Sequence, residues 1–321
     1  MKKKRAIVVG SKGQDGRLLF VYLKKIGYSV LGLSREKSEA TEARWARKRI
    51  SILNSESVRK VVRDFEPDEI YHLAAFHHSS QDPRIAELEL FRQSFDVNTM
   101  TTLYLLEAIR NECPKTHLFY AASSHVFGSP MGSPQDEQTP LDPENVYGIS
   151  KATAIMMCRY YRKVHGVFAS VGILYNHESE LRPSRFVSKK ITEGAVAIKQ
   201  GAAKNIILGD LNAAIDWGYA PDYVRAMQQI LSLRKSEDFV IATGKAHRVK
   251  DFVRLAFGRL GLSFEKYVKV DKRLVSRSKT TLVGNSNKLR RMTGWKPSQS
   301  FDAMVKILVD AEIKTQSREK K

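Results

Sequence analysis

The sequence predicts an α/β fold in which a doubly wound parallel sheet is followed by a smaller C-terminal lobe. From residue 5 to about residue 176, short apolar runs alternate with stretches of helical spacing. This is the pattern of a parallel sheet with helices on both faces. Beyond that point the pattern is more mixed and more charged. We therefore expect a first domain over residues 1–175 and mainly a second lobe over residues 176–321, with some later segments returning to the sheet.

Each element has its own local signal. Five apolar runs predict buried strands, and they cover residues 5–10, 29–34, 70–75, 117–124 and 168–176. Four stretches with apolar residues three and four apart predict helices, and they cover residues 16–28, 55–69, 97–112 and 150–166. The first strand and the first helix each end at a glycine, and the second helix ends near a proline.

The composition excludes several classes of protein. With 321 residues, of which 42% are hydrophobic, the chain can bury a large core. The two cysteines, Cys113 and Cys158, have neither disulfide-framework nor metal-type spacing, so we expect no structural metal. The apolar run after the basic start covers only residues 6–9 and is too short for a signal peptide, and no run is long enough to span a membrane. We expect a cytoplasmic protein.

The formal net charge of +20 raises the question of an anionic partner. Nucleic acid or a phosphorylated small molecule is one explanation. A solvated, lysine-rich surface with basic ends is the other, and it is favoured because no nucleic-acid-binding motif accompanies the charge. We therefore expect no nucleic-acid partner and no membrane partner.

A glycine-rich loop joins the first predicted strand to the first helix. Gly10, Gly13 and Gly16 are spaced GxxGxxG within this loop. Glycine lets the backbone turn tightly and approach a pyrophosphate at a helix N-terminus. A glycine pattern alone is weak evidence, but at the first strand–helix turn of an α/β chain it predicts a Rossmann-type dinucleotide site.

The end of the second strand bears on which dinucleotide is bound. An acid at that point accepts the ribose hydroxyl of NAD, but here Leu33 and Ser34 are followed by Arg35. An arginine pairs with the 2′-phosphate of NADP, so the sequence favours NADP. In the alternative interpretation, Arg35 and Lys37 are solvated charges on a loop.

Tyr147 and Lys151 lie four residues apart at the start of a predicted helix, so their side chains fall on one face. A nearby ammonium group lowers the pKa of a tyrosine. The tyrosine then exchanges a proton with a sugar hydroxyl while a nicotinamide exchanges hydride with the same carbon. Ser123 ends the intervening strand, and we expect it to hydrogen bond that oxygen. YxxxK spacing alone is common, but together with the glycine loop it is specific.

These motifs resemble the extended short-chain dehydrogenase/reductases that modify nucleotide sugars, and most closely the GDP-mannose 4,6-dehydratase family. The resemblance covers almost the whole chain and includes GSKGQDG, EPDEIYHLAA, LYLLEAIR, FYAASSHVFG, VYGISKATA, GILYNHESELRPSRFVSKKIT, LGDLNAAIDWGYAPDYVRAM, DFVIATG and TGWKP. It implies a lyase of cell-surface polysaccharide biosynthesis, with an NADP-binding N-terminal lobe and a C-terminal lobe that clasps a sugar nucleotide.

The resemblance also implies roles for individual residues. It implies cofactor contacts for Gly10, Ser11, Lys12, Gly13, Gln14, Asp15, Gly16, Arg35, Leu73, Ala74, Ala75, Tyr147, Lys151, His177 and Arg182. It implies substrate contacts for Asn176, Val187, Lys190 and Arg277. Without the resemblance, His177 is interpreted as a loop histidine and Lys190 as a solvated helix charge.

The chain departs from the family pattern at several positions. The family usually has threonine, serine and glutamate where this chain has Ser123, Ser124 and His125. Serine keeps the hydroxyl group, but histidine removes the carboxylate credited with acid–base work at the sugar. Ile215 stands where the family has an arginine that holds GDP. A GDP-sugar is therefore favoured by the family resemblance alone. The family loop that helps to make a tetramer is shorter here after Arg35, which favours a homodimer.

Three functions stay open. A 4,6-dehydratase needs a base and an acid beside the sugar ring, and neutral histidine can do both jobs near pH 7. His125 is then the proton shuttle of a catalytic set with Ser123, Tyr147 and Lys151, and this interpretation comes first. An NADPH-dependent 4-keto-6-deoxy-sugar reductase or a C4 epimerase needs only the other three residues. In a catalytically silent NADP- or sugar-nucleotide-binding protein, His125 only fills space.

Overall fold

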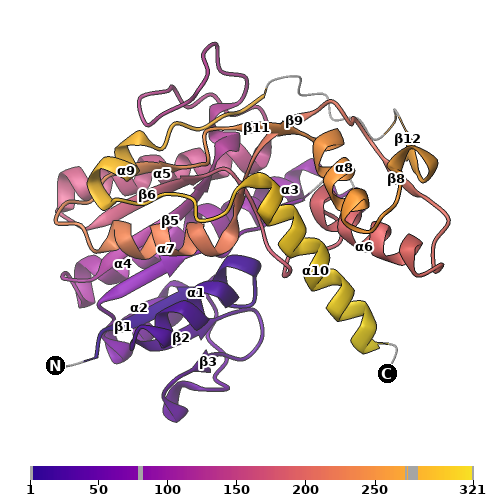
Figure 1. Ribbon diagram of the computed structural model, residues 1–321. Helices are drawn as coiled ribbons and strands as arrows, with labels where there is room; N and C mark the ends of the chain where they lie inside the picture. The colour runs from indigo at the N-terminus through magenta and orange to yellow at the C-terminus, as the bar shows by residue number, and fades with distance from the viewer. Residues whose placement is uncertain (1–2, 79–81, 272, 274–280, 320–321) are drawn as a thin grey trace.

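A seven-stranded sheet forms the centre of the protein (Figure 1). The computed structural model describes residues 3–78, 82–271, 273 and 281–319. The strands run in the order β10-β6-β5-β4-β1-β2-β3, and only β2 and β3 pair in antiparallel fashion. Their bounds are β1 (Arg5–Val9), β2 (Ser29–Leu33), β3 (Glu39–Ala40), β4 (Glu69–His72), β5 (His117–Ser123), β6 (Ala169–Leu174) and β10 (Asp238–Ile241). The predicted doubly wound α/β fold is confirmed.

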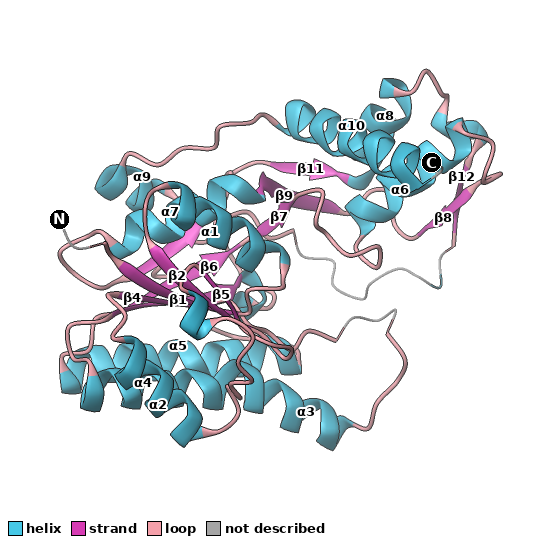
Figure 2. Cartoon of the chain, turned by 90° about the horizontal axis from the view of Figure 1, so that it is seen from below, coloured by secondary structure: helices cyan, strands magenta, loops and turns pink. Residues whose placement is uncertain are grey.

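Helices cover both faces of this sheet (Figure 2). One face carries α2 (Ser55–Phe65), α4 (Thr101–Glu112) and α5 (Val146–His165), and the other carries α1 (Gln14–Lys25), α7 (Ala220–Leu231) and α9 (Asn287–Thr293). Successive residues of a strand point to opposite faces, so Tyr120 of β5 packs in one hydrophobic core and its neighbour Phe119 in the other. This explains why the central strands are continuous apolar runs rather than alternating ones.

The second lobe has its own core around Trp217, Phe252 and Phe301. Its helices are α6 (Val187–Lys199), α8 (Val249–Arg259) and α10 (Phe301–Glu319). Its two small sheets contain β7 (Asn176–Glu178), β9 (Ala214–Tyr219) and β11 (Ala246–Arg248), and β8 (Ile206–Leu208) and β12 (Val268–Val270). The chain leaves this lobe to form α7 and β10, which belong to the layers of the main sheet, and then returns to it.

Several element boundaries differ from the sequence expectation. The predicted helix 97–112 begins as α4 at Thr101, because residues 96–100 form a π-helical turn between α3 (Glu87–Phe95) and α4. The predicted helix 150–166 begins earlier, at Val146, because the side chain of Asn145 caps it. Short 3₁₀ turns cover Ala43–Trp45, Ser124–Phe127 and Phe264–Lys266.

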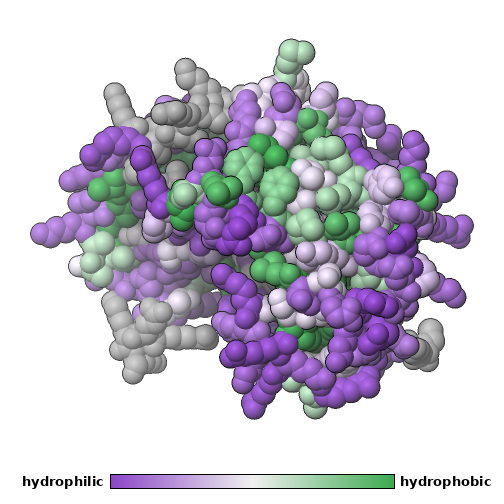
Figure 3. Space-filling view, turned by 180° about the vertical axis from the view of Figure 1, so that it is seen from behind, coloured by the Kyte–Doolittle hydropathy of each residue, from purple (hydrophilic) through white to green (hydrophobic). Residues whose placement is uncertain are grey.

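The surface is mainly hydrophilic, as the high net charge requires. The face shown in Figure 3 has a hydrophilic rim and a group of hydrophobic residues near its middle. On α5 the side chains of Met156, Tyr160 and Val164 are exposed at four-residue intervals. Among the described residues, no helix combines the length and the apolar character that crossing a membrane requires. The same residues contain no group of three or more His, Cys, Asp or Glu side chains placed to hold a metal ion.

Candidate active site

The predicted site residues gather at one edge of the main sheet. Neighbouring strands from β1 to β5 are parallel, so their carboxyl ends lie side by side. The glycine loop follows β1, residues 73–75 follow β4, and Ser123 ends β5. Ligands of open α/β sheets bind at this edge.

The loop between β1 and α1 has the form of a pyrophosphate site. Gly10 has a φ of 93°, and a Cβ at this position would lie 2.6 Å from the backbone nitrogen of Ala74. No side chain caps the start of α1, so its first N–H groups remain available to an anion. Within the described part of the chain, the buried Ser11 hydroxyl has no hydrogen-bond partner. These residues fit the dinucleotide that the sequence predicts.

His177 of β7 lies against this loop. Its Nε2 is 2.9 Å from Asp15 Oδ2, and its Nδ1 is 2.6 Å from the carbonyl oxygen of Tyr175. Because both partners are acceptors, both ring nitrogens donate and the imidazole is charged. Burial acts to lower the pKa of His177, but the Asp15 carboxylate outweighs burial, so the pKa is raised. Burial acts to raise the pKa of Asp15, which His177 nevertheless holds below its usual value.

Gln14 strengthens the same connection between the loop and the second lobe. Its Nε2 donates to the carbonyl oxygen of His177 at 3.1 Å, and its Oε1 accepts from the Ser179 hydroxyl at 2.9 Å. The predicted cofactor residues Gln14, Asp15 and His177 therefore bind one another and fix β7 to the start of α1.

The charged residues predicted to contact the cofactor lie in different settings. Arg35 is exposed just after β2. Lys12 lies 3.5 Å from the Glu39 carboxylate. Arg182 pairs with Glu178, with Nε 3.1 Å from Oε2, and its guanidinium lies over a phenylalanine ring of the second lobe. Arg35 is therefore the one of these three without an ion pair among the described residues.

The tyrosine, lysine and serine come together where α5 faces β5. The Ser123 hydroxyl lies near the Tyr147 side chain and acts to lower its pKa. Lys151 Nζ donates to the carbonyl oxygen of Ala121 at 2.8 Å and lies 5.7 Å from the centroid of the Tyr147 ring. Lys151 is fully buried, which fixes its amine in this position.

Burial dominates the electrostatics of this group. Burial raises the pKa of Tyr147 to about 12, although Arg182 and the Ser123 hydroxyl act against it. Burial also lowers the pKa of Lys151 to about 7, and no neighbouring charge offsets it. Burial therefore outweighs the expected lowering of the tyrosine pKa by Lys151 in this structure, because the desolvated amine carries only part of its charge near pH 7.

His125 lies beside the tyrosine, on the 3₁₀ turn after β5. Its ring centroid is 5.9 Å from that of Tyr147 at an angle of 82°. Its Nδ1 lies 3.3 Å from Nδ2 of Asn145, whose Oδ1 already accepts from the Gly148 N–H at 2.9 Å as the cap of α5. The amide nitrogen must therefore donate to His125, which places the imidazole proton on Nε2. The His125 side chain is exposed at the rim of the site, but the surrounding protein still desolvates it and lowers its pKa.

A second histidine, His77, which the motifs in the sequence do not indicate, also lies in the site. Its ring lies 4.9 Å from Tyr147 at 85° and 6.5 Å from His125, between centroids. Burial lowers its pKa to about 4, with His125, Arg185 and Arg182 adding to the effect. One signal was available: His77 follows β4, whose carboxyl end lies next to that of β5.

The predicted substrate residues lie where the second lobe meets this edge. Asn176 precedes His177 on β7, and Val187 and Lys190 lie in the first turn and a half of α6. Phe186, directly before α6, stacks on His77 with 6.0 Å between ring centroids. The start of α6 therefore reaches the proposed reaction site. The predicted contact Arg277 lies outside the described residues.

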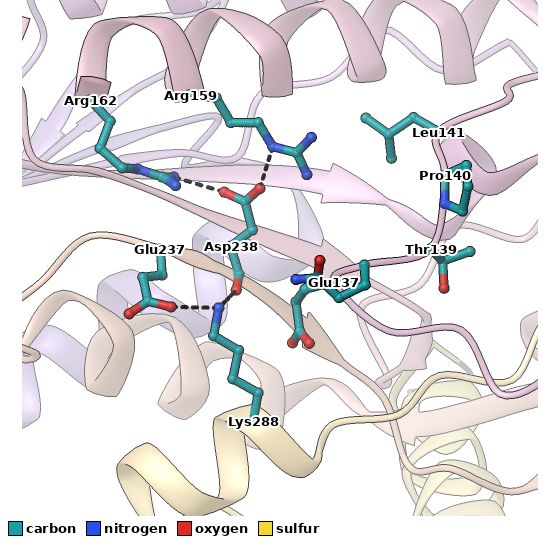
Figure 4. Close-up of a pocket in the computed structure, with 10 residues that line it drawn as sticks. Glu137, Thr139, Pro140, Leu141, Arg159, Arg162, Glu237, Asp238 and Lys288 are labelled. Carbon is teal, nitrogen blue, oxygen red and sulfur yellow. Dashed lines mark hydrogen bonds and ion pairs between the residues drawn. The ribbon is translucent and has the colours of Figure 1, made fainter. Parts of the chain in front are cut away.

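A cavity of about 400 Å³ lies elsewhere in the described structure and contains none of the predicted site residues (Figure 4). Asp238 accepts from Arg159 Nε at 2.6 Å and from Arg162 Nη2 at 2.7 Å. Lys288 Nζ lies 2.6 Å from a Glu237 oxygen. Each basic side chain that lines the cavity is therefore paired, the two arginines with Asp238 and the lysine with Glu237.

Comparisons with known proteins agree with this arrangement. A family model described as GDP-mannose 4,6 dehydratase matches residues 7–308. GDP-mannose 4,6 dehydratase 2 of Arabidopsis thaliana is 36% identical and the alignment covers 99% of this chain and 89% of the relative. GDP-mannose 4,6-dehydratase of Vibrio cholerae is 32% identical, with 98% and 95% covered.

Solved structures show the same fold at lower identity. RMD from Pseudomonas aeruginosa, complexed with NADPH, superposes with a TM-score of 0.80 at 21% identity, covering 98% of this chain and 100% of that one. UDP-glucose 4-epimerase from Thermotoga maritima, with UDP-glucose, gives a TM-score of 0.83 at 22% identity, covering 97% and 99%. The family match over nearly the whole length, together with relatives above 30% identity, shows that the chain belongs to the GDP-mannose 4,6-dehydratase family.

Proposed function

We propose that the protein is an NADP-dependent nucleotide-sugar 4,6-dehydratase acting on a GDP-sugar. The observation that carries this proposal is that Ser123, Tyr147 and Lys151 come together at the sheet edge beside the glycine loop. Relatives named GDP-mannose 4,6-dehydratase support the reaction and the substrate. Neighbours solved with NADPH or NAD support a nicotinamide cofactor.

The site residues divide the redox step among them. A bound nicotinamide takes up and returns a hydride, and it carries a positive charge when oxidised. The hydroxyls of Ser123 and Tyr147 bind the sugar oxygen at C4, and Tyr147 as phenolate takes its proton. Lys151 holds the end of β5 through the Ala121 carbonyl and stabilises the phenolate when charged.

The cofactor is proposed to be NADP because of Arg35. It is exposed at the carboxyl end of β2 without an ion pair among the described residues, so its guanidinium is available to a 2′-phosphate. The backbone N–H groups at the start of α1, residues 14–16, would hold the pyrophosphate.

A reductase or C4 epimerase is the second candidate. It is favoured by the state of His125, which replaces the family carboxylate and presents a hydrogen-bond donor rather than a base. Either reaction needs only Ser123, Tyr147 and Lys151 besides the cofactor. The silent-binding interpretation is disfavoured because this set is complete.

A homodimer in the cytoplasm remains part of the proposal. The apolar side chains of Met156, Tyr160 and Val164 form an exposed stripe on α5, and such stripes mark contacts with other chains. Sedimentation velocity would test the dimer, and Tyr160→Glu should yield a monomer.

Product masses distinguish the candidate reactions. The protein is incubated with a panel of nucleotide sugars and their 4-keto-6-deoxy forms, with and without NADPH. Loss of water identifies a dehydratase, gain of two hydrogens a reductase, and altered stereochemistry at constant mass an epimerase. His125→Ala should slow water loss, and dehydration at the wild-type rate would remove His125 from the acid–base step.

A further inference from the structure

Two imidazoles, rather than one, contact the phenol ring of Tyr147. His77 and His125 each meet it edge-on, at 85° and 82°, with centroid distances of 4.9 Å and 5.9 Å. The two imidazoles are 6.5 Å apart. His77 is the nearer of the two to the tyrosine.

The loop that carries His77 is fixed by a buried asparagine. Asn98 Oδ1 accepts from the N–H of Phe76 at 3.0 Å, and Asn98 Nδ2 lies 3.2 Å from the Phe76 carbonyl oxygen. The same Nδ2 donates to the Ser150 hydroxyl at 3.0 Å. Ser150 lies on α5 one residue before Lys151, so His77 and Tyr147 are held in one frame.

The second lobe holds the imidazole from the other side. The ring of Phe186 is stacked on His77 at 28°, and the Arg182 guanidinium lies 3.7 Å from the centroid of the Phe186 ring. Despite this support, Nδ1 of His77 is buried without a hydrogen-bond partner among the described residues. An unpaired buried nitrogen costs free energy, so its retention at this position points to a ligand or to chemistry.

His125 is poorly suited to the role of base in this geometry. Asn145 occupies its Nδ1 with a donor, and its Nε2 already carries the proton. Neither nitrogen can accept a proton until the cap of α5 rearranges. A donated hydrogen bond is what this imidazole can supply directly.

We propose that His77 is the base that takes the C5 proton of the sugar and that His125 acts as a neutral hydrogen-bond donor to a sugar oxygen. This rests on the proposed dehydratase function. The family uses one carboxylate for acid–base catalysis at the sugar. In this chain, His77 transfers the proton and His125 donates the hydrogen bond.

The proton transfers balance over one turnover. After Tyr147 has taken the O4 proton and hydride has left C4, the C5–H bond breaks and His77 takes the proton. The electron pair forms the C5–C6 double bond as the C6–O bond breaks, and His77 gives its proton to the departing oxygen, which leaves as water. When hydride returns to C6, the proton held by Tyr147 reaches C5 through His77, and both side chains regain their starting state.

The basicity of His77 supports this role. Its pKa of about 4 is close to the ordinary value of about 4.3 for a glutamate carboxyl. A neutral His77 near pH 7 therefore has a ring nitrogen free to accept a proton. His125, Arg182 and Arg185 lower its pKa and Asp82 raises it, so the surroundings favour the neutral form near pH 7.

The test compares His77→Asn with His125→Asn and with His78→Asn as the matched control. His78 is the adjacent histidine, and its Nε2 lies 2.9 Å from the Pro83 carbonyl oxygen. Each variant is given GDP-mannose and NADP in D₂O, and the absorbance of bound NADPH, the rate of water loss and deuterium at C5 are measured. Tm and NADP affinity establish that each variant is folded, with His77→Gln as a second substitution.

We expect His77→Asn to accumulate bound NADPH and to lose water at least about 10²-fold more slowly, the usual contribution of a general base. His125→Asn should lose about tenfold, as for one hydrogen bond, and His78→Asn should match the wild type. Water loss by His77→Asn within about threefold of the wild type would overturn the role of His77 while leaving the dehydratase function intact. A wild type that neither forms NADPH nor loses water would overturn both.

Discussion

The His177 imidazole and the Asp15 carboxylate are hydrogen bonded at 2.9 Å although 162 residues separate them in the sequence. Asp15 lies in the first turn of α1, and His177 lies on β7 with its ring stacked on Tyr223 of α7 at 4.4 Å. The pair therefore connects the glycine loop, the second lobe and the helix layer of the main sheet. Because both members of the pair are charged, the stability of this connection depends on pH.

We expect the free energy of unfolding to fall as the pH rises through the raised pKa of His177, above its ordinary 6.5. A group whose pKa is raised on folding contributes stability below its unfolded pKa and loses it above the folded value. On the acid side, the contribution is lost as the pH falls through the lowered pKa of Asp15, below 3.8. Urea unfolding of the wild type and of His177→Gln between pH 5 and about 9 measures this fall in the free energy of unfolding. The variant should not show it. His165→Gln, at the exposed end of α5, is the control. If the free energy of unfolding of His177→Gln fell with pH as in the wild type, the assignment of this fall to His177 would be refuted.

Arg35 should determine the preference for NADP over NAD. A charged hydrogen bond to the 2′-phosphate contributes about 1.5–3 kcal/mol. Arg35→Ala should weaken NADP binding by that amount and change NAD binding little, whereas Lys37→Ala on the same exposed loop should affect both slightly. Titration calorimetry with both dinucleotides measures the difference. Equal weakening of NADP and NAD by Arg35→Ala would show that this residue does not recognise the phosphate.

Tyr147→Phe should abolish turnover and leave NADP binding nearly unchanged. The substitution removes the proposed proton carrier at C4 but keeps the ring that His77 and His125 contact. The free energy of unfolding should change by only about 1 kcal/mol, since a single hydroxyl group is removed. Activity retained within a few-fold of the wild type would exclude Tyr147 from the mechanism.

Asn145→Asp should reverse the tautomer of His125 without uncapping α5. An aspartate still accepts from the Gly148 N–H, and its second oxygen accepts from His125 Nδ1 where the amide donated. The carboxylate should raise the pKa of His125, which burial lowers in the wild type. NMR titration of the His125 ring measures the shift, with Asn145→Ser as a capping control that leaves Nδ1 free. Identical titration curves for the wild type and Asn145→Asp would contradict the assigned tautomer.

The sequence was sufficient to predict the parts of the site that depend on strand order. Ser123 and the glycine loop meet because parallel strands place their carboxyl ends together, and Tyr147 and Lys151 share a helix face because they are four residues apart. These relationships follow from local spacing and from the fold class. Family membership then added His177, which has no distinctive local pattern.

The role of His77 depends on contacts that spacing does not encode. Its position results from the Asn98 side chain, which binds the backbone of Phe76 and the hydroxyl of Ser150. The proton position on His125 likewise depends on Asn145 being the cap of α5, whereas the apolar pattern predicts a helix only from residue 150. The raised pKa of Tyr147 follows from burial, which appears only when both lobes are assembled.

The path of the chain through α7 and β10 has a consequence for cooperativity. These segments follow β7 and β9 of the second lobe, yet β10 pairs with β6 and α7 covers one face of the main sheet. A chain ending at residue 175 would leave β6 as an unpaired edge and would expose the apolar side chains beneath α7. The main sheet therefore completes its core only with segments that the chain reaches through the second lobe, so we expect the whole molecule to melt in a single transition. A ligand that binds to either lobe then stabilises both lobes against unfolding.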